Sequence, residues 1–409
     1  MDLTLLLDLD GSLLDTNLPE FVPAYFKVLA DHLSTRVTPE IMLPALVAGT
    51  RRMTTNADPR FTLQEVFEAE FYARIGIPKA ELAPSLARFY ADVFPRLGAL
   101  TSRRAEAEPF VAWARASHFR LAIATDPLFP ALATIERVRW AGLDPASFAI
   151  VSAFEEFHFS KDHSAFYAEL LGRLGWPDGA VLMVGDDLQR DIRPAERIGL
   201  QTYLLRAANE TVAPSDDGRA GTLPDLQTWI QHASAELRAP NGSTRDAVMA
   251  ILLTTPAVLD GMTRALAETD WLHEAAPGDW SLVELVCHLR DTEREIHHGQ
   301  LRRFDDEKEP FIPRPDAGVW ARQRPYRDQD GRQALREFAA ARLETLAQLG
   351  DLSEAEWNRR ARHAIFGPST FLEVIGFMAE HDRLHIRQAS RTLVSGLGLQ
   401  RLVPPLDVL

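Results

Sequence analysis

Two kinds of hydrophobic pattern divide the chain. Up to about residue 230, short continuous apolar runs alternate with segments whose apolar residues recur at helical spacing. The runs are Leu3–Leu9, Leu121–Thr125, Phe148–Ser152, Ala180–Gly185 and Gln201–Leu205. Because alternating strands and helices form a mostly parallel sheet with helices on both faces, this half is predicted to be a doubly wound α/β domain.

An insert separates the first two apolar runs. It covers about 16–105, and its apolar residues follow helical spacing throughout. The segments with this spacing are 20–34, 38–48, 61–75 and 79–97. The insert is therefore predicted to be a small α-helical cap on the sheet domain.

From residue 244 onward no strand pattern is found, and long helical segments follow one another. They lie near 244–268, 281–304, 330–349 and 369–395, and the second begins with the capping box Ser281–Glu284. This part is predicted to be an all-α four-helix bundle. Since the polar stretch 239–243 has linker composition, the expected domains are 1–235 and 244–409, joined by a linker at 236–243.

Length and charge narrow the function classes. A chain of 409 residues is too long for one compact core, and 46% hydrophobic with 25% charged residues is the balance of a soluble globular protein. A formal net charge of −14 repels phosphate backbones and anionic lipid surfaces, so neither nucleic acid nor a membrane is expected as a partner.

The single cysteine, Cys287, cannot form an internal disulfide and fits a reducing compartment, so a cytoplasmic location is expected. The apolar start Leu3–Leu7 is interrupted by Asp8 and Asp10 and has no basic region before it, so it is interpreted as a buried strand rather than a targeting segment.

Two carboxylates stand where the first strand ends. Asp8 and Asp10 are two residues apart, which places both on one face of a strand, and Gly11 then permits a tight turn. Active sites of parallel sheets form at this carboxyl edge. One acid could attack a substrate while the other moves protons.

Four separated motifs resemble those of the haloacid dehalogenase (HAD) superfamily, in the expected order. They are the signature Asp8–Thr16, a strand ending in Thr125, Lys161 at the start of a helix, and an acidic loop from Gly185 to Asp191. The resemblance covers residues 1–235. It implies a Rossmann-like core, a helical cap and attack by Asp8 on the substrate, with Asp10 as general acid and base.

The resemblance also implies the site's cofactor. Mg²⁺ would be held by the Asp8 carboxylate, the Asp10 backbone carbonyl and Asp186, with Asp187 and Asp191 in support. A phosphate monoester is a dianion, so an anionic nucleophile needs this charge before it can approach.

The expected reaction is hydrolysis of a phosphate ester rather than displacement of a halide. Thr125 and Lys161 would bind the phosphoryl oxygens, and the dehalogenating members of the superfamily lack an acid at the position of Asp10. The substrate is therefore expected to be a small phosphorylated metabolite. Arg51 and Arg52, in a polar stretch of the cap, could contact an anionic leaving group, or they could simply be solvated.

Histidines concentrate after residue 244, where seven of the twelve lie. On the fourth helix, the apolar positions Phe371, Val374 and Met378 continue at helical spacing into His381 and His385. His288 flanks the inward stripe of the second helix. These three imidazoles are predicted to hold one divalent transition metal, Zn²⁺ or Ni²⁺. His297, His298 and His363 are interpreted as satisfied or solvent-facing side chains.

The segments Trp280–Glu293 and His381–Gln388 resemble the DinB/YfiT-like superfamily of metal-binding four-helix bundles. The resemblance implies His288, His381 and His385 as ligands, and a transferase-like reaction with a low-molecular-weight thiol. Cys287 points away from His288 around the helix and is expected to be structural. Two interpretations stay open: a bifunctional enzyme, or a phosphatase whose bundle only binds metal, senses a ligand or forms a homodimer.

Overall fold

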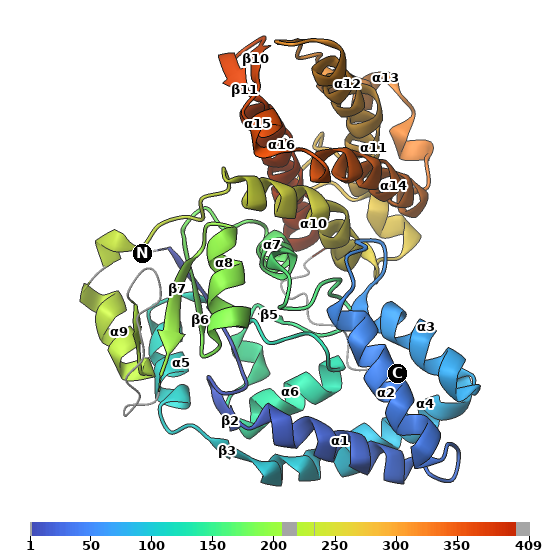
Figure 1. The fold of residues 1–409 in the computed structure, drawn as a ribbon, viewed down its shortest axis with the longest axis vertical. Coiled ribbons are helices and arrows are strands. Elements are labelled where there is room, and N and C mark those ends of the chain that lie inside the picture. Colours follow the sequence, from blue (N-terminus) through green and yellow to red (C-terminus); the bar gives the residue numbers. More distant parts are fainter. Residues whose placement is uncertain (1, 207–218, 233, 398–409) are drawn as a thin grey trace. The chain divides into compact units, whose positions relative to one another are not determined.

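The computed structural model describes residues 2–206, 219–232 and 234–397 (Figure 1). Contacts divide the chain into two compact units, Met1–Tyr167 with Pro177–Pro240 and Ala168–Trp176 with Asn241–Gln400. The break after Pro240 falls inside the predicted linker 236–243.

A six-stranded parallel sheet forms the centre of the first unit. Its strand order is β5, β4, β1, β6, β7, β8, and Leu5 of β1 lies opposite Leu121 and Leu182. All of β1 is buried, as expected of a strand with helices on both faces. The strands are β1 (Leu3–Leu7), β4 (Arg120–Ile123), β5 (Ile150–Val151), β6 (Ala180–Gly185), β7 (Gln201–Leu205) and β8 (Ala220–Gly221).

Helices cover this sheet on two sides. Phe110, Val138 and Leu226 share one apolar core with Leu5, so their helices pack on one face. Right-handed crossovers then require α8 on the other face, where Figure 1 shows it. The helices are α5 (Ala107–Ala116), α6 (Ala131–Trp140), α8 (Arg193–Arg197) and α9 (Leu223–His232), and a further helix, α7 (Ser164–Arg173), is divided between the two units. The predicted doubly wound α/β core is confirmed.

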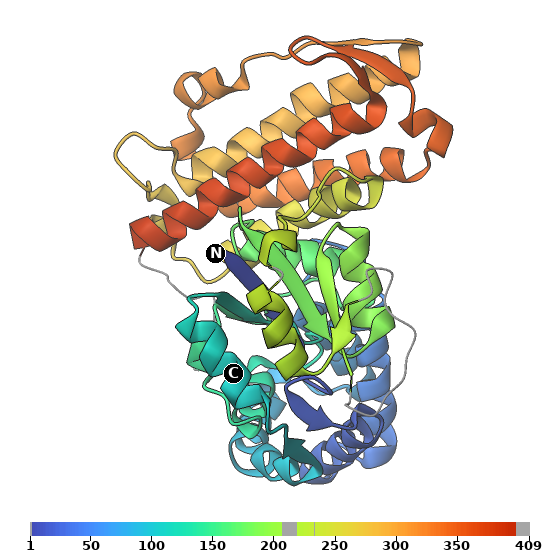
Figure 2. The same ribbon diagram turned by 90° about the vertical axis from the view of Figure 1, so that its left-hand side faces the viewer.

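The insert is helical, as predicted. Figure 2, which turns the view of Figure 1, shows its helices in blue, and their aromatic core includes Phe21, Phe71 and Phe94. They are α1 (Leu18–His32), α2 (Pro39–Thr54), α3 (Leu63–Ile75) and α4 (Lys79–Arg88). The antiparallel pair β2 (Leu14–Thr16) and β3 (Thr101–Arg103) joins the two ends of the insert. These three-residue strands were not predicted, because they are too short to show a period.

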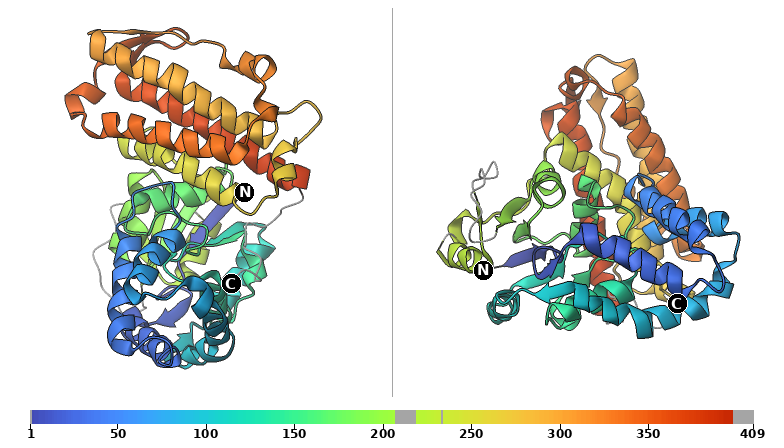
Figure 3. Two further views of the ribbon diagram at one scale, coloured as in Figure 1. Left: turned by 90° about the vertical axis from the view of Figure 1, so that its right-hand side faces the viewer. Right: turned by 60° about the horizontal axis from the view of Figure 1, so that its bottom comes forward.

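Four long helical segments build the second unit, and they run side by side in Figure 3 (left). The second is continuous through a π-helical turn, Thr292–His297, between α11 and α12. The segments are α10 (Arg245–Thr263), α11 (Leu282–Asp291) with α12 (His298–Asp306), α14 (Gly331–Gly350) and α16 (Phe371–Arg391). The predicted bundle is confirmed over the part of it that the structure describes.

The expectation that no strand follows residue 244 is wrong. A small sheet joins β9 (Phe311–Ile312), β10 (Arg360–His363) and β11 (Gly367–Thr370) in the order β11, β10, β9. The strand β10 pairs antiparallel with β11 across the turn 364–366, and Gly367, which follows the turn, has a φ of +74°. Of the residues of β10 and β11 only Thr370 is β-branched, so the sequence carries little strand signal.

The helix α10 is long and apolar enough to cross a bilayer by length and composition. Its most apolar window is 72% buried, which is the behaviour of a core helix in a soluble protein. Its apolar residues are therefore explained by packing within the bundle.

Candidate functional site

The first candidate site lies at the carboxyl end of β1. The Asp8 amide donates to the Val184 carbonyl at 2.9 Å, which continues the pairing of β1 with β6 for one residue. Asp8 is 5% exposed and Asp10 9% exposed. Gly11 has a φ of +80°, and a side chain there would collide with the Asp186 carboxylate. Only glycine lets this loop approach Asp186 so closely.

The acidic loop after β6 meets the end of β1. Asp8, Asp186 and Asp191 each place a carboxylate oxygen within 4.8 Å of the others, a group that could hold a metal ion. The predicted ligands Asp8 and Asp186 are thus brought together, with Asp191 as a direct neighbour. The Asp187 side chain accepts from the Gln189 and Arg190 amides and caps the following turn. Its support of the metal ligands stays a prediction.

The ammonium of Lys161 contacts both sides of this acidic group. Its Nζ lies 2.6 Å from Asp8 Oδ1 and also pairs with Asp191. Burial opposes the charge of Lys161, but Asp191 and Asp8 outweigh it and hold the pKa of Lys161 well above its ordinary value. Lys161 is therefore a permanent cation beside the Asp8 carboxylate.

Two carboxyl groups of this site ionise less readily than an ordinary aspartate. Burial and the nearby charge of Asp8 raise the pKa of Asp186 to about 6 and the pKa of Asp191 to about 7. The surrounding cavity of about 530 Å³ is lined by the carboxylates Asp8, Asp10, Asp126, Asp186, Asp187 and Asp191 and by the cations Arg137, Lys161 and Arg190. Six acids against three bases leave an excess of negative charge, which fits a divalent cation.

Magnesium is expected to raise the thermal stability of the chain more at about pH 8 than at about pH 5.5. The folded pKa values of Asp186 and Asp191, about 6 and about 7, lie above their ordinary value of 3.8. Protonation therefore stabilises the fold at low pH, and this contribution is lost as the pH rises through 6 to 7. A cation replaces it only when the carboxylates are ionised.

The measurement is the change in Tm on adding Mg²⁺ at the two pH values. Asp186→Asn should reduce the pH dependence of this change, whereas Asp246→Asn, at the exposed start of α10, should not. An equal change at both pH values in the unaltered chain would contradict the assignment.

Thr125 and Asp10 face each other at the ends of β4 and β1. The Thr125 hydroxyl donates to Asp10 Oδ2 at 3.4 Å, and the Thr125 carbonyl accepts from Ser152. The same Asp10 oxygen pairs with Arg137, which sequence reasoning missed. The burial of Arg137 could have been inferred from the sequence, because it shares the buried face of α6 with Thr134 and Val138.

Arg51 and Arg52 are not brought to this cavity. Both are exposed near the end of α2, and neither is among the residues that line the acidic cavity. Their predicted contact with a substrate stays a prediction.

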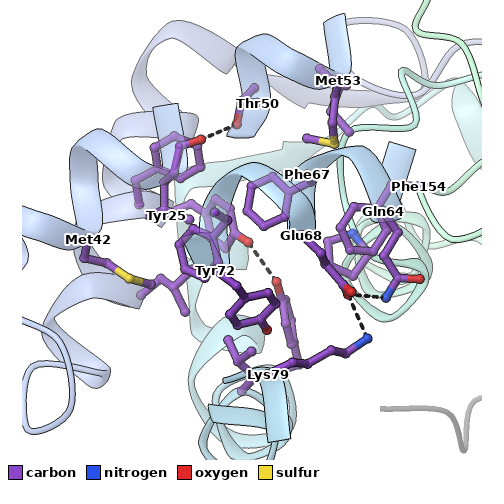
Figure 4. A pocket seen from close by; sticks show the side chains of 18 of the residues that line it. Tyr25, Met42, Thr50, Met53, Gln64, Phe67, Glu68, Tyr72, Lys79 and Phe154 are labelled. Atoms are coloured by element: carbon purple, nitrogen blue, oxygen red, sulfur yellow. Dashed lines mark hydrogen bonds and ion pairs between the residues drawn. The ribbon is translucent and has the colours of Figure 1, made fainter. Parts of the chain in front are cut away.

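A separate apolar cavity of about 90 Å³ lies among the cap helices (Figure 4). Tyr25, Phe67 and Tyr72 line it, and the Tyr25 and Tyr90 hydroxyls are hydrogen-bonded at 2.8 Å. The polar groups at this cavity are engaged with one another, since the Glu68 carboxylate accepts from both Gln64 and Lys79. The acidic cavity is therefore the better candidate for chemistry in this unit.

The second candidate site lies in the bundle, where three imidazoles converge. Nε2 of His381 lies 3.2 Å from Nε2 of His288 and 3.1 Å from Nε2 of His385. The predicted capping box Ser281–Glu284 starts the helix that carries His288. Trp280 lies parallel to the His385 ring, with 5.7 Å between centroids. The structure thus brings all three predicted ligands together.

Two of these imidazoles are held neutral, the state in which an imidazole binds a metal. Burial, with the neighbouring histidines, lowers the pKa of His288 to about 2 and the pKa of His385 to about 3. Nδ1 of His385 lies 3.1 Å from Gln388 Oε1, which leaves its Nε2 lone pair directed to the centre. Three nitrogen ligands with no fourth protein ligand in the group fit a borderline ion such as Zn²⁺ or Ni²⁺.

A buried ionic network lies in the core of the same bundle. Arg342 contacts Glu293 Oε2 at 2.8 Å and Asp382 Oδ2 at 2.5 Å, and both carboxylates are fully buried. His297 Nδ1 lies 2.9 Å from the same Glu293 oxygen, and Thr345 donates to Glu293. Since Asp382 follows His381, the network holds the backbone that carries two of the imidazoles. Sequence reasoning missed it.

The remaining side chains singled out in this half behave as expected. His297, His298 and His363 each have a hydrogen-bond partner, and Cys287 is buried. Burial raises the pKa of Cys287 to about 11, so its thiol is protonated at neutral pH. Cys287 is a structural thiol.

Comparisons with known proteins agree with both halves. Residues 158–225 match a family model described as HAD-hydrolase-like, and residues 251–389 match the DinB superfamily. Both resemblances seen in the sequence are thereby confirmed. No curated protein matches the chain at a significant level.

Solved structures similar to parts of the chain include members of both groups. A HAD phosphatase from Thermococcus onnurineus is 17% identical, with 56% of this chain and 98% of that chain covered and a TM-score of 0.37. A 2-haloacid dehalogenase from Pseudomonas syringae is 20% identical, covering 57% and 99%, with a TM-score of 0.39. YfiT from Bacillus subtilis, a four-helix bundle, is 18% identical, covering 37% and 87%, with a TM-score of 0.34.

Proposed function

We propose that the first unit, a HAD-like hydrolase, cleaves phosphomonoesters through an aspartyl-phosphate on Asp8. One observation carries the proposal: the buried Asp8 carboxylate is held at 2.6 Å by Lys161, in one group with Asp186 and Asp191, at the carboxyl edge of the sheet. The substrate class is a small phosphorylated metabolite.

The acidic group fits Mg²⁺ by the chemistry of its donors, which are all oxygens. Asp8, the Asp10 carbonyl and Asp186 would hold the ion, which when bound supplies positive charge to the phosphoryl oxygens. Lys161 keeps the Asp8 oxygen in place and adds a fixed cation, and the Thr125 hydroxyl can donate to a phosphoryl oxygen once a substrate displaces its contact with Asp10.

Asp8 attacks phosphorus, and the bond from phosphorus to the ester oxygen breaks. Asp10 gives a proton to that departing oxygen, so the alcohol leaves neutral. Asp10 then accepts a proton from water as the water attacks the phosphorus of the aspartyl-phosphate, which releases phosphate and restores Asp8. A dehalogenase needs no such acid, so Asp10 favours phosphate esters.

We further propose that the bundle binds one divalent transition metal through His288, His381 and His385. The supporting observation is the convergence of the three imidazoles, in which Nε2 of His381 lies 3.2 Å from Nε2 of His288 and 3.1 Å from Nε2 of His385. A transferase-like reaction with a low-molecular-weight thiol follows from the resemblance, and the protonated Cys287 is not its nucleophile. The alternative is a bundle without catalysis that binds metal, senses a ligand or forms a homodimer.

The full-length chain is expected to carry about one transition metal, and His288→Ala, His381→Ala and His385→Ala should each lose most of it. Three ligands on two helices leave no spare imidazole in the group to replace a lost one. Elemental analysis of purified protein measures this. His273→Ala, at an exposed position, is the matched control.

Phosphatase rates of the same proteins test whether the sites are separate. Imidazole ligands prefer Zn²⁺ or Ni²⁺ and carboxylates prefer Mg²⁺, so metal loss without loss of hydrolysis is expected. Full metal content in all three variants would refute the histidine site, and a parallel collapse of hydrolysis would refute its independence.

A further inference from the structure

A buried guanidinium stands in the wall of the acidic cavity. Arg137, on α6, is 1% exposed and lies over the face of Phe129, with 4.4 Å from its central carbon to the ring centroid. Burial lowers the pKa of Arg137 to about 10, and the charge of Asp8 counteracts this shift, so the side chain still carries its charge at neutral pH. A full positive charge is therefore buried against an aromatic ring.

Most of the hydrogen-bonding capacity of Arg137 is unused. One terminal nitrogen pairs with Asp10, whereas Nε and Nη1 are buried and have no hydrogen-bond partner among the residues described. A buried N–H group without a partner costs about 1–3 kcal/mol, so such donors are normally satisfied. Arg137 lines the cavity of about 530 Å³, so a molecule bound there can supply the acceptor.

The position of Arg137 tells which part of a substrate it would meet. Lys161 contacts Asp8, on the side of the attacking carboxylate, whereas Arg137 contacts Asp10, which serves the departing oxygen. The guanidinium of Arg137 is therefore placed on the side of the leaving alcohol. The other two cations of the cavity each pair with two carboxylates, Lys161 with Asp8 and Asp191 and Arg190 with Asp126 and Asp162, whereas Arg137 pairs with Asp10.

We propose that Arg137 is a specificity-determining residue that binds a carboxylate on the alcohol part of the substrate, so that the enzyme prefers phosphate esters of short hydroxy acids. The inference rests on the proposed phosphatase function. When Asp10 is protonated to act as general acid, the charge of the guanidinium is left to match one negative charge of the substrate, which favours a carboxylate over a second phosphate. In this proposal the anionic leaving group is bound by the buried Arg137 rather than by the exposed Arg51 and Arg52.

The test compares matched pairs of substrates. Carboxymethyl, 2-carboxyethyl and 3-carboxypropyl phosphates are each measured against the alkyl phosphate of equal length. The unaltered chain should favour the best carboxylated ester by at least about tenfold in kcat/KM, mainly through KM. Arg137→Gln and Arg137→Lys should lower this preference, the Lys variant less, because it keeps the charge but not the planar donors. Arg139→Gln, on the same helix with its side chain 53% exposed, should keep it.

A second readout does not depend on turnover. In the Asp8→Asn background with Mg²⁺, calorimetric binding of the best carboxylated ester should weaken about tenfold with Arg137→Gln, while binding of its alkyl partner changes less. If the Arg137 variants do not fold, the test is the comparison of each carboxylated ester with its alkyl partner in the unaltered chain. If the chain does not hydrolyse 4-nitrophenyl phosphate, the phosphatase function itself is overturned. If it does hydrolyse this ester but shows no preference for carboxylated esters, or if the Arg137 variants lose activity equally on both members of a pair, only the role of Arg137 is overturned.

Discussion

Asp8→Asn is expected to abolish Mg²⁺-dependent phosphomonoester hydrolysis, with a loss on the order of 10⁴-fold or more. An amide cannot form the aspartyl-phosphate, and it also removes one of the three carboxylates that are grouped for the metal. Little stability should be lost, because Lys161 keeps its pairing with Asp191 and the repulsion on Asp186 and Asp191 is relieved. The measurement is phosphate release from 4-nitrophenyl phosphate with and without Mg²⁺.

Asp2→Asn is the matched control, since it makes the same change at an exposed position at the start of β1. Its rate should equal that of the unaltered chain. Asp10→Asn should slow hydrolysis strongly but leave Asp8 able to react. If Asp8→Asn kept full activity with an unchanged Mg²⁺ dependence, Asp8 would not be the nucleophile.

Arg342→Leu should destabilise the bundle by about 3–5 kcal/mol, the largest effect on stability expected of a single change here. Arg342 is the cation between Glu293 and Asp382, and both of these carboxylates are fully buried. Its removal also takes a donor from the Leu252 carbonyl, which accepts at 2.9 Å. The deficit should shrink on acidification, because the two stranded carboxyl groups can then be protonated.

Thermal and urea unfolding of the metal-free chain, followed at about pH 8 and about pH 5.5, measures this effect. Arg336→Leu, at an exposed position on the same helix α14, is the control and should change stability by less than about 0.5 kcal/mol. A deficit for Arg342→Leu within that same range would show that the network does not stabilise the bundle. Metal content should fall as well, since Asp382 is covalently next to His381.

The sequence was sufficient to predict the strands and helices with a clear hydrophobic pattern and the motifs that lie on a single strand or loop. The five predicted strands and all four bundle helices are present, because continuous apolar runs and heptad-like spacing report burial directly. Asp8 and Asp186 meet, as expected, because parallel neighbours β1 and β6 end at the same edge. His381 and His385 were readable from a single helix face.

Contacts between segments far apart in the chain could not be predicted from the sequence. Arg137 reaches Asp10 across 127 residues of chain, and Arg342 joins carboxylates from two other helices. Neither has a local motif, and the only signal is a charged residue on the buried face of a helix. The short strands β2, β3 and β9 were missed because two or three residues cannot show a period of two.

Chemical trapping of the intermediate tests the central claim most directly. The full-length chain is mixed with Mg²⁺ and excess phosphomonoester, quenched with acid and treated with borohydride, which reduces an acyl phosphate to an alcohol. Peptide mass spectrometry then locates the reduced residue. Reduction is expected at Asp8 alone and only with substrate, and more of it is expected in Asp10→Asn, where water is activated slowly. Substrate turnover with no reduction at Asp8, or with reduction at another carboxylate, would contradict it.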